Sequence, residues 1–392
     1  VVELVSTEAV IDETTGETTQ ETKTVADQIT LPANTQVYYV GGQAQAIKLT
    51  RDIQTEKATA AVRTYEGQPS GTVFSQPLEV KFQAPVIVTV EPDYVLGVLY
   101  QNENDINQYI KEDHLKDVLV RTNHFYQSEK YGIDINLEFV LATKDKNGTT
   151  LPEPGVERVP FNELPIDCEK FMRDNTGKYT SLLWEPNEYI NIMVYPFTDS
   201  QILGISTFPY SLKDFFLEGT QQVSASWITL ENLSFPYCIS INSSYIYEQS
   251  TDERINQNDA AITLAHELGH YLGLRHVFSE GGTTSMCTDT DYCKDTPSYN
   301  RSEYEQWLNN LDKQNKYQLK DLAKRYSCEK GEYEAHNIMD YAYCFYNEIT
   351  LEQRKRIRHI LNYSPLIPGP KESRIDTRGV QGRLNLPICI MK

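Results

Sequence analysis

An eleven-residue stretch, HELGHYLGLRH at 266–276, constrains this chain more than any other part of its sequence. On a helix, residues four apart lie on one face, so His266 and His270 can present their imidazoles to a single ion. Gly273 can adopt the left-handed conformation that ends a helix and turns the chain, which would return His276 as a third ligand. Three neutral imidazoles favour zinc, and three protein ligands leave a fourth position for water. The stretch therefore predicts a helix and a sharp turn around a zinc ion.

Glu267 lies beside the first two histidines and can reach a water on the ion without being a ligand itself. We expect it to act as general base and then general acid in a hydrolytic reaction. The alternative is a carboxylate that only caps or pairs on the helix surface. Three of the chain's seven histidines lie in this one stretch, which argues for a metal site over an accidental match.

The composition limits the partners of the chain. A net charge of -19 disfavours nucleic acid and anionic membrane surfaces, since both select for clustered Lys and Arg. No run approaches the roughly 18 apolar residues that a membrane helix needs, so we expect no transmembrane segment. The chain opens on VVELVSTEAVIDE without a recognisable signal peptide, which says little about targeting.

The chain contains seven cysteines, and none of them forms a CxxC pair, which argues against a zinc ribbon or a thioredoxin-like redox site. Four of them follow the zinc stretch closely: Cys287, Cys293, Cys328 and Cys344. Disulfides that clamp a loop-rich region are one interpretation, and they favour an oxidising, extracytoplasmic location. Buried free thiols are the other interpretation. The odd number leaves at least one cysteine without an intramolecular partner.

The hydrophobic pattern divides the chain into three parts. Residues 1–85 contain short β-like runs separated by turn residues, which predict a small all-β, sandwich-like domain, with a mobile acidic arm as the alternative for 1–30. Residues 86–365 alternate strands with helix-like segments, which predicts an α+β domain with a mixed sheet and packed helices. Residues 366–392 predict a tail along the surface.

Several helices are expected within the α+β domain. They cover 107–129, 167–174, 259–274, a charged stretch at 302–326, and 350–361. Asn258 or Asp259 is the predicted N-cap of the zinc helix, and Thr350 is the predicted N-cap of the last helix.

The zinc stretch and the downstream NIMDY at 337–341 together resemble the metzincin metalloproteases, and within them the pappalysin family. ILGISTFPY at 202–210 is similar to that family's substrate-lining edge strand, and KDTPSYN at 294–300 resembles its loop with an Asp-Thr-Pro. NIMDYAYC followed by TLEQRKRIRHIL is similar to its Met-turn, trailing cysteine and final helix. The resemblance covers residues 86–365.

The resemblance implies a two-lobed metzincin domain with zinc at the floor of the cleft, and a secreted endopeptidase that acts on protein or peptide substrates. With its β-rich amino-terminal domain, the chain also resembles envelope metalloproteases of Bacteroidetes, which are often lipoproteins. It departs from the family at 302–326, where a charged, helix-like segment is inserted and is expected to narrow the cleft.

The resemblance also assigns roles around the Met-turn. Tyr341 would present its phenol to zinc or to the oxyanion, with an aromatic wall residue as the alternative. Met339 would form an apolar floor beneath the imidazoles, although an ordinary core methionine looks the same in a sequence. Asp340 would make structural hydrogen bonds around the turn.

Two further expectations follow from the resemblance. In pappalysin-like enzymes, oxygen-rich loops hold calcium, and the candidates here are Asp289, Asp291, Asp295 and Thr296, with a solvated acidic loop as the alternative. The family's two-disulfide arrangement favours Cys287 with Cys328 and Cys293 with Cys344, out of three pairings that four cysteines allow.

The edge strand beginning Leu203, Gly204, Ile205 and Ser206 is expected to receive substrate as an added antiparallel strand. The function that competes with a zinc endopeptidase is a surface binding protein on a catalytically silent protease fold, or a latent form in which residues 1–85 or the tail block the zinc. The sequence leaves the natural substrate and the oligomeric state open.

Overall fold

The computed structural model divides the chain into two compact units, Val1–Val88 and Thr89–Lys392. Before residue 92 the structure describes only the backbone of seven strands. After that it describes the chain to residue 391 except for 128–132, 134, 146, 226, 252–254, 280–288, 313–314, 328–330, 342, 370 and 372–381.

Every element described in the amino-terminal unit is a strand, which agrees with the all-β prediction. Five strands form an antiparallel sheet in the order β1 (Val2–Glu3), β6 (Thr59–Val62), β7 (Leu78–Gln83), β4 (Gln36–Tyr39) and β5 (Ile47–Lys48). A separate hairpin pairs β2 (Val5–Ile11) with β3 (Thr18–Thr24).

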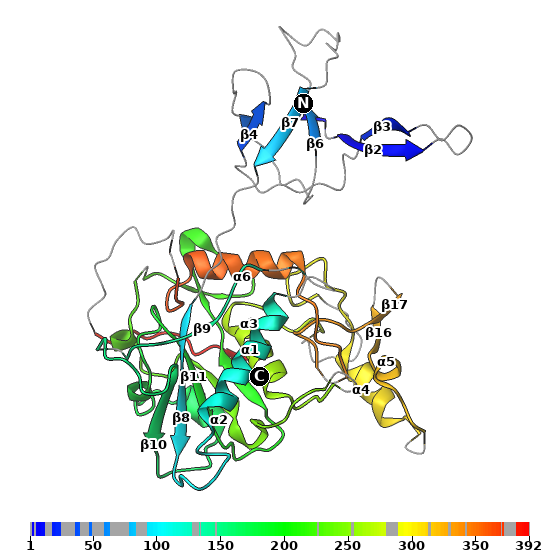
Figure 1. Ribbon diagram of the computed structural model, residues 1–392. Coiled ribbons are helices and arrows are strands. Elements are labelled where there is room, and N and C mark those ends of the chain that lie inside the picture. The colour runs from blue at the N-terminus through cyan, green and yellow to red at the C-terminus, as the bar shows by residue number, and fades with distance from the viewer. Residues whose placement is uncertain are drawn as a thin grey trace. The chain divides into compact units, whose positions relative to one another are not determined.

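A mixed sheet forms the centre of the second unit (Figure 1). Its strands lie in the order β10 (Val156–Pro160), β8 (Asp93–Tyr100), β11 (Ile190–Tyr195), β15 (Ile239–Asn242), β12 (Gly204–Thr207) and β18 (Ile390–Met391), and β9 (Val140–Leu141) also pairs with β8. The first four strands are parallel to one another, whereas β12 and β18 run antiparallel to their neighbours.

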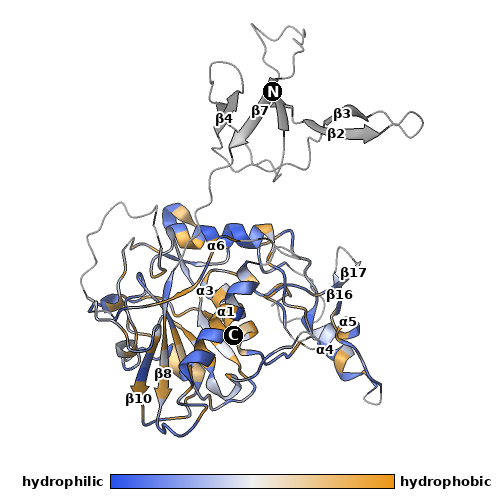
Figure 2. Cartoon of the chain, viewed as in Figure 1, coloured by the Kyte–Doolittle hydropathy of each residue, from blue (hydrophilic) through white to orange (hydrophobic). Residues whose placement is uncertain are grey.

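The central strands are apolar because both faces of the sheet are covered. All six residues of β11 are buried, which is typical of a parallel strand between two layers, and Figure 2 shows hydrophobic residues concentrated along the sheet. Alternate residues point to opposite faces, so Ile192 packs with the layer of α1 (Glu112–Tyr126) and α3 (Ala260–Tyr271), while Met193 packs with α2 (Cys168–Arg173).

The predicted helix starts are confirmed where capping side chains define them. Asp259 caps α3 by accepting a hydrogen bond from the Ala261 N–H, at 2.8 Å. Thr350 caps α6 (Leu351–Tyr363) in a capping box with Gln353. Both caps satisfy backbone N–H groups that a helix leaves without intrahelical partners.

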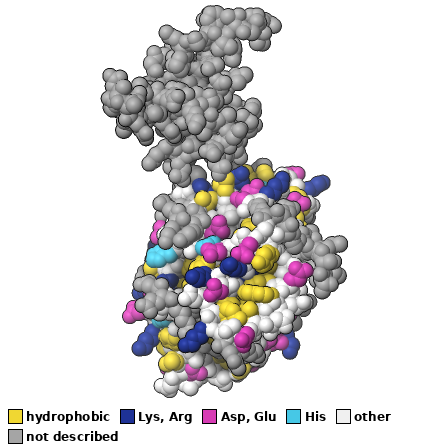
Figure 3. All heavy atoms as spheres, turned by 90° about the vertical axis from the view of Figure 1, so that its right-hand side faces the viewer, with side chains coloured by type: hydrophobic (Ala, Val, Ile, Leu, Met, Phe, Trp, Pro, Cys, Tyr) yellow, Lys and Arg dark blue, Asp and Glu magenta, His cyan; other side chains and the backbone are white. Residues whose placement is uncertain are grey.

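The charged, helix-like segment predicted over 302–326 is helical only in part. The segment contains α4 (Arg301–Asn309) and the short α5 (Leu319–Leu322), and it then enters a hairpin of β16 (Lys324–Ser327) with β17 (Gly331–Glu334). Arg325 is buried, whereas the residues on either side of it are exposed. This alternation of buried and exposed residues is typical of a β-strand. Figure 3 views the second unit from the side of this insertion, where charges of both signs surround hydrophobic side chains.

The predicted tail also contributes an element, because β18 extends the sheet beyond β12. Other residues of this segment, Leu384, Leu386 and Ile388, pack against the core. Within the described residues, no helix is both long enough and apolar enough to cross a membrane.

Candidate active site

Three buried imidazoles converge at the end of α3. His266 and His270 lie one turn apart on the helix, and His276 follows the turn after it. One ligand atom from each ring lies within 4.8 Å of the other two, and the Nε2 atoms of His270 and His276 are 3.1 Å apart. Among the described residues, this is the one group of three or more metal-binding side chains arranged in this way.

Gly273 makes the turn that brings in the third ring. Its φ is +90°, in the left-handed region, as the sequence predicts. The Leu274 N–H donates to the Gly269 carbonyl at 2.8 Å, which closes the end of the helix. A Cβ at this glycine would lie 2.7 Å from Cγ1 of Ile360, so α6 also excludes a side chain here.

Hydrogen bonds to backbone carbonyls orient two of the rings. Nδ1 of His266 lies 2.8 Å from the Ile338 carbonyl, and Nδ1 of His270 lies 2.8 Å from the Leu274 carbonyl. A carbonyl selects the tautomer with the proton on Nδ1, which leaves Nε2 as a lone-pair donor. Nε2 of His266 is buried without a hydrogen-bond partner.

The electrostatics of the rings also suit a metal ion. Burial lowers the pKa of His266 to about 4. Burial, followed by repulsion from the neighbouring rings, lowers the pKa of His270 and His276 well below the usual value. Neutral imidazoles are the form that binds metal, so the residues present fit a zinc ion.

Glu267 is buried beside the imidazoles, and its Oε2 has no hydrogen-bond partner. Burial raises the pKa of this carboxyl well above its usual value. Gly204 of β12 packs directly against it, because a Cβ at Gly204 would lie 2.6 Å from Cγ of Glu267 and 2.8 Å from its Oε1. No space for a side chain therefore remains between Gly204 and the carboxyl.

The Met-turn segment lies against the end of α3. Met339 is fully buried, and its sulfur fills the space that a Cβ on Gly269 would need, so the two residues are in close contact. Asp340 accepts hydrogen bonds from the Tyr299 hydroxyl at 2.5 Å and from the Tyr341 N–H at 2.7 Å. Its second oxygen lies 3.4 Å from Nε of Arg325, which is also buried.

The ring of Tyr341 faces the imidazoles. Its centroid is 4.6 Å from that of His276, in an edge-to-face arrangement, and 5.5 Å from that of His266. The guanidinium of Arg301, from α4, lies over the ring at 4.4 Å from its centroid. Nη2 of Arg325 donates to the Tyr341 carbonyl at 3.2 Å, so two arginines contact this tyrosine.

A cleft of about 490 Å³ opens over this site. Its walls come from β12 and the residues before it, from the start of α3, from Arg301, and from the Met-turn. The lining residues include Leu203, Gly204, Thr263, His266, Glu267 and Tyr341. One predicted zinc ligand, His266, therefore lines this cleft together with the predicted base and the predicted phenol.

The predicted substrate-lining strand is not a free edge along its whole length. Ile205 and Ser206 pair with β15 on one side, and Ser206 also pairs with Met391 of β18 on the other. Leu203 and Gly204 line the cleft.

The calcium expectation is not supported, because the four side chains bind protein groups. Asp291 accepts a hydrogen bond from the Thr296 hydroxyl at 2.6 Å, and burial raises the pKa of Asp291 to about 8. Asp295 accepts from the Thr350 hydroxyl at 2.7 Å, which ties the loop to the start of α6. Asp289 accepts from the Asp291 N–H at 3.2 Å.

The disulfide expectation is corrected for one pair. Cys293 and Cys344 are both buried free thiols, and they lie beside the carbonyls of Asp291 and Asn337, at 3.6 and 3.3 Å, respectively. Cys287 and Cys328 lie outside the described residues.

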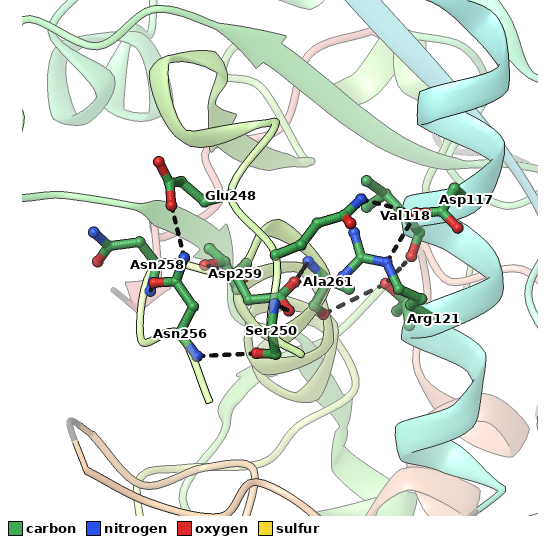
Figure 4. A network of polar contacts seen from close by, with 12 residues as sticks. Asp117, Val118, Arg121, Glu248, Ser250, Asn256, Asn258, Asp259 and Ala261 are labelled. Atoms are coloured by element: carbon green, nitrogen blue, oxygen red, sulfur yellow. Dashed lines mark hydrogen bonds and ion pairs between the residues drawn. The ribbon is translucent and has the colours of Figure 1, made fainter. Parts of the chain in front are cut away.

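A polar network holds the start of α3, and sequence reasoning found only its cap. Nη1 of Arg121, from α1, lies 2.6 Å from Oδ1 of Asp259, while Oδ2 of Asp259 accepts from the Ser250 N–H at 2.6 Å (Figure 4). Asn256 bonds to Ser250 and to Glu248 in the same network. Arg121 is 138 residues from Asp259, so no local pattern signals their contact.

Comparisons with known proteins show that this chain is similar to peptidases. Residues 226–362 match the model of the peptidase family described as pregnancy-associated plasma protein-A. Extracellular metalloproteases of Arthroderma otae and Arthroderma benhamiae are 31% and 30% identical to this chain over 188 residues, which are 47% of this chain and 55% of each relative. The chain thus spans about half the length of the curated relatives it matches. A solved structure of mature mirolysin from Tannerella forsythia, in complex with a cleaved peptide, is 22% identical, with a TM-score of 0.46 over 69% of this chain and 90% of that one.

Proposed function

We propose that this chain belongs to the pappalysin family of metzincin metalloproteases and is a zinc-dependent endopeptidase. One observation carries the proposal: three neutral imidazoles converge beside a buried carboxyl whose Oε2 has no partner, at the base of a cleft. A buried carboxyl without compensation is costly, and a bound cation would supply that compensation.

His266, His270 and His276 would hold the zinc ion through their Nε2 atoms. When bound, zinc acts as a Lewis acid and lowers the pKa of a bound water to about 7. The carbonyls of Ile338 and Leu274 keep the rings of His266 and His270 in the metal-binding tautomer. Met339 supports the helix from below with an apolar contact at Gly269.

Glu267 moves the proton during hydrolysis. Its carboxylate would accept a proton from the attacking water and then deliver it to the leaving amine. Tyr341 would donate its phenol to the oxyanion that develops on the scissile carbonyl, since its ring lies against His276 on the wall of the cleft. Asp340 and Arg325 act as positioning residues, because they fix the backbone of Tyr341 on both sides.

The substrate would enter as an extended strand along β12, beginning with Leu203 and Gly204 in the cleft. Main-chain hydrogen bonds supply affinity in this mode, and sequence demands are therefore limited. Gly204 has no side chain, which lets the scissile bond come close to Glu267.

Arg301 gives the cleft a charge preference. Of the described residues that line the cleft, Arg301 is the one with a permanent positive charge. Its present partner is the exposed Glu305, one turn along α4 at 2.6 Å, and such surface pairs contribute only about 0.3–0.5 kcal/mol. An acidic substrate side chain can therefore take the place of Glu305, and we propose a preference for Asp or Glu beside the scissile bond.

Cleavage of an unfolded protein and of a peptide library tests the activity. Turnover is expected to stop with a chelator and to return with zinc. Glu267→Gln is expected to abolish turnover while the protein keeps its metal, measured by elemental analysis. Cleavage within long peptides supports an endopeptidase, whereas release of single terminal residues supports an exopeptidase.

The competing function is a surface binding protein on a silent protease fold. It requires a closed cleft or a disordered set of imidazoles, and neither agrees with the open cleft and the oriented rings. Since the matched relatives are extracellular, we propose an extracytoplasmic location for this chain as well.

A further inference from the structure

The outer edge of β12 is taken by a distant segment of the same chain. Ser206 lies opposite Met391, and Thr207 lies opposite Ile390, in antiparallel pairing. The ladder continues one residue further, because the Phe208 N–H donates to the Cys389 carbonyl at 2.8 Å. The segment 389–391 therefore fills three consecutive positions on this edge.

This segment points toward the catalytic carboxyl. It runs from the position opposite Phe208 to the position opposite Ser206, and Gly204 lies two residues further along β12, or about 7 Å. Gly204 is the residue that packs against Glu267. The segment thus has the edge, the orientation and the extended conformation that an antiparallel substrate strand requires.

The attachment of the segment is strong at one end and weak at the other. Upstream, the Asn232 side chain donates to the Gly382 carbonyl at 2.7 Å, and the Tyr210 hydroxyl donates to the Pro387 carbonyl at 2.7 Å. The part on β12 is a two-residue strand whose side chains, Ile390 and Met391, are only partly buried. The anchor keeps the segment close while the short ladder can open, which gives a high effective concentration at this edge.

We infer that residues 389–391 are an intramolecular competitor of substrate, which occupies the β12 edge on one side of Glu267 and must be displaced before a long peptide can pair there. The inference rests on the proposed peptidase function. A substrate that contacts only the Leu203–Gly204 part of the strand does not meet this competition, whereas one that extends along Ser206 and Thr207 does.

Shortening the chain before Ile388 tests the inference, since this removes the competitor and keeps the Tyr210–Pro387 anchor. For a peptide that spans the whole cleft, KM of the shortened enzyme is expected to be about tenfold lower than KM of the intact enzyme, with kcat unchanged. This is the change expected if the β12 edge is free in about one-tenth of the intact molecules. A peptide with the sequence of 386–391, with Ser in place of Cys389, is expected to inhibit the shortened enzyme competitively, while a scrambled peptide does not.

A second measurement uses the intact chain and does not depend on how the shortened one folds. In zinc-loaded Glu267→Gln, a bound spanning peptide is expected to speed hydrogen exchange at residues 388–391. Equal KM values in both enzymes, or unchanged exchange with the peptide bound, would overturn the inference. If neither the intact nor the shortened enzyme cleaves any peptide with zinc present, the proposed function fails instead.

Discussion

The substitution Gly204→Ala is expected to lower kcat/KM about 100-fold. The added Cβ would lie 2.6 Å from Cγ of Glu267 and 2.8 Å from its Oε1, whereas carbon atoms in contact prefer about 3.5–4.0 Å. Either the carboxyl or β12 must therefore move by about 1 Å. A misplacement of this size at a catalytic group costs about 100-fold, or about 2.7 kcal/mol of transition-state stabilisation.

The assay for this variant distinguishes a displaced Glu267 carboxyl from a loss of protein stability. We expect kcat/KM on a fluorogenic peptide to fall, while zinc content stays stoichiometric because the ligands are on α3 and its turn. Ser240→Ala on the neighbouring strand is the matched control, since its hydroxyl bonds to Tyr195 and Met172 and not to Glu267. That control should lose some thermal stability and keep its turnover. A Gly204→Ala enzyme with normal kcat/KM would refute the argument that this glycine positions the carboxyl.

The remaining predictions concern charges around the cleft. Glu267→Gln should abolish turnover with zinc still bound, and measurable turnover would remove it as the proton carrier. Arg301→Glu should shift selectivity from Glu-containing toward Lys-containing peptides by about tenfold, which is about 1.4 kcal/mol. Glu305→Gln should instead strengthen the preference for acidic peptides, because it removes the present partner of Arg301. Unchanged cleavage profiles in both variants would contradict the role assigned to Arg301. Arg325→Met leaves Asp340 buried without its cation and should destabilise the fold by about 3–5 kcal/mol in urea unfolding, and replacing Asp340 with Asn in the same protein should recover part of that loss.

Sequence reasoning predicted the parts of the site whose geometry is local. The spacing of His266 and His270 fixes their shared face, and Gly273 marks the turn to His276, so one short motif determines all three positions. The caps Asp259 and Thr350 belong to the same class, because a capping side chain bonds within three residues of itself. The helix predicted over 167–174 likewise corresponds to α2.

The parts that the sequence did not reveal depend on contacts between distant residues. Arg325 lies in a segment with the composition of a charged surface helix. It is nevertheless buried against Asp340 and against the ring of Tyr304. The segment 389–391 has no helical or long β pattern, and only the unfilled edge of β12 gives it a structure. In both cases a contact with a distant part of the chain determines the conformation, because the local secondary-structure propensity of the segment is too weak to do so.

The two buried carboxyls of the site, Asp340 and Glu267, differ in their hydrogen-bond partners and therefore in the roles they can have. Asp340 and Glu267 both lie in surroundings that raise the pKa of a carboxyl through burial. Asp340 is held by Arg325, by the Tyr299 hydroxyl and by the Tyr341 N–H, and these contacts fix the Met-turn. Oε2 of Glu267 has no such partner, and the nearest candidates for compensation are a cation held by the three imidazoles and the protons of a water or an amine. A carboxyl in this state changes its protonation readily when charge moves next to it, which is the property that a group passing a proton from water to a leaving amine must have.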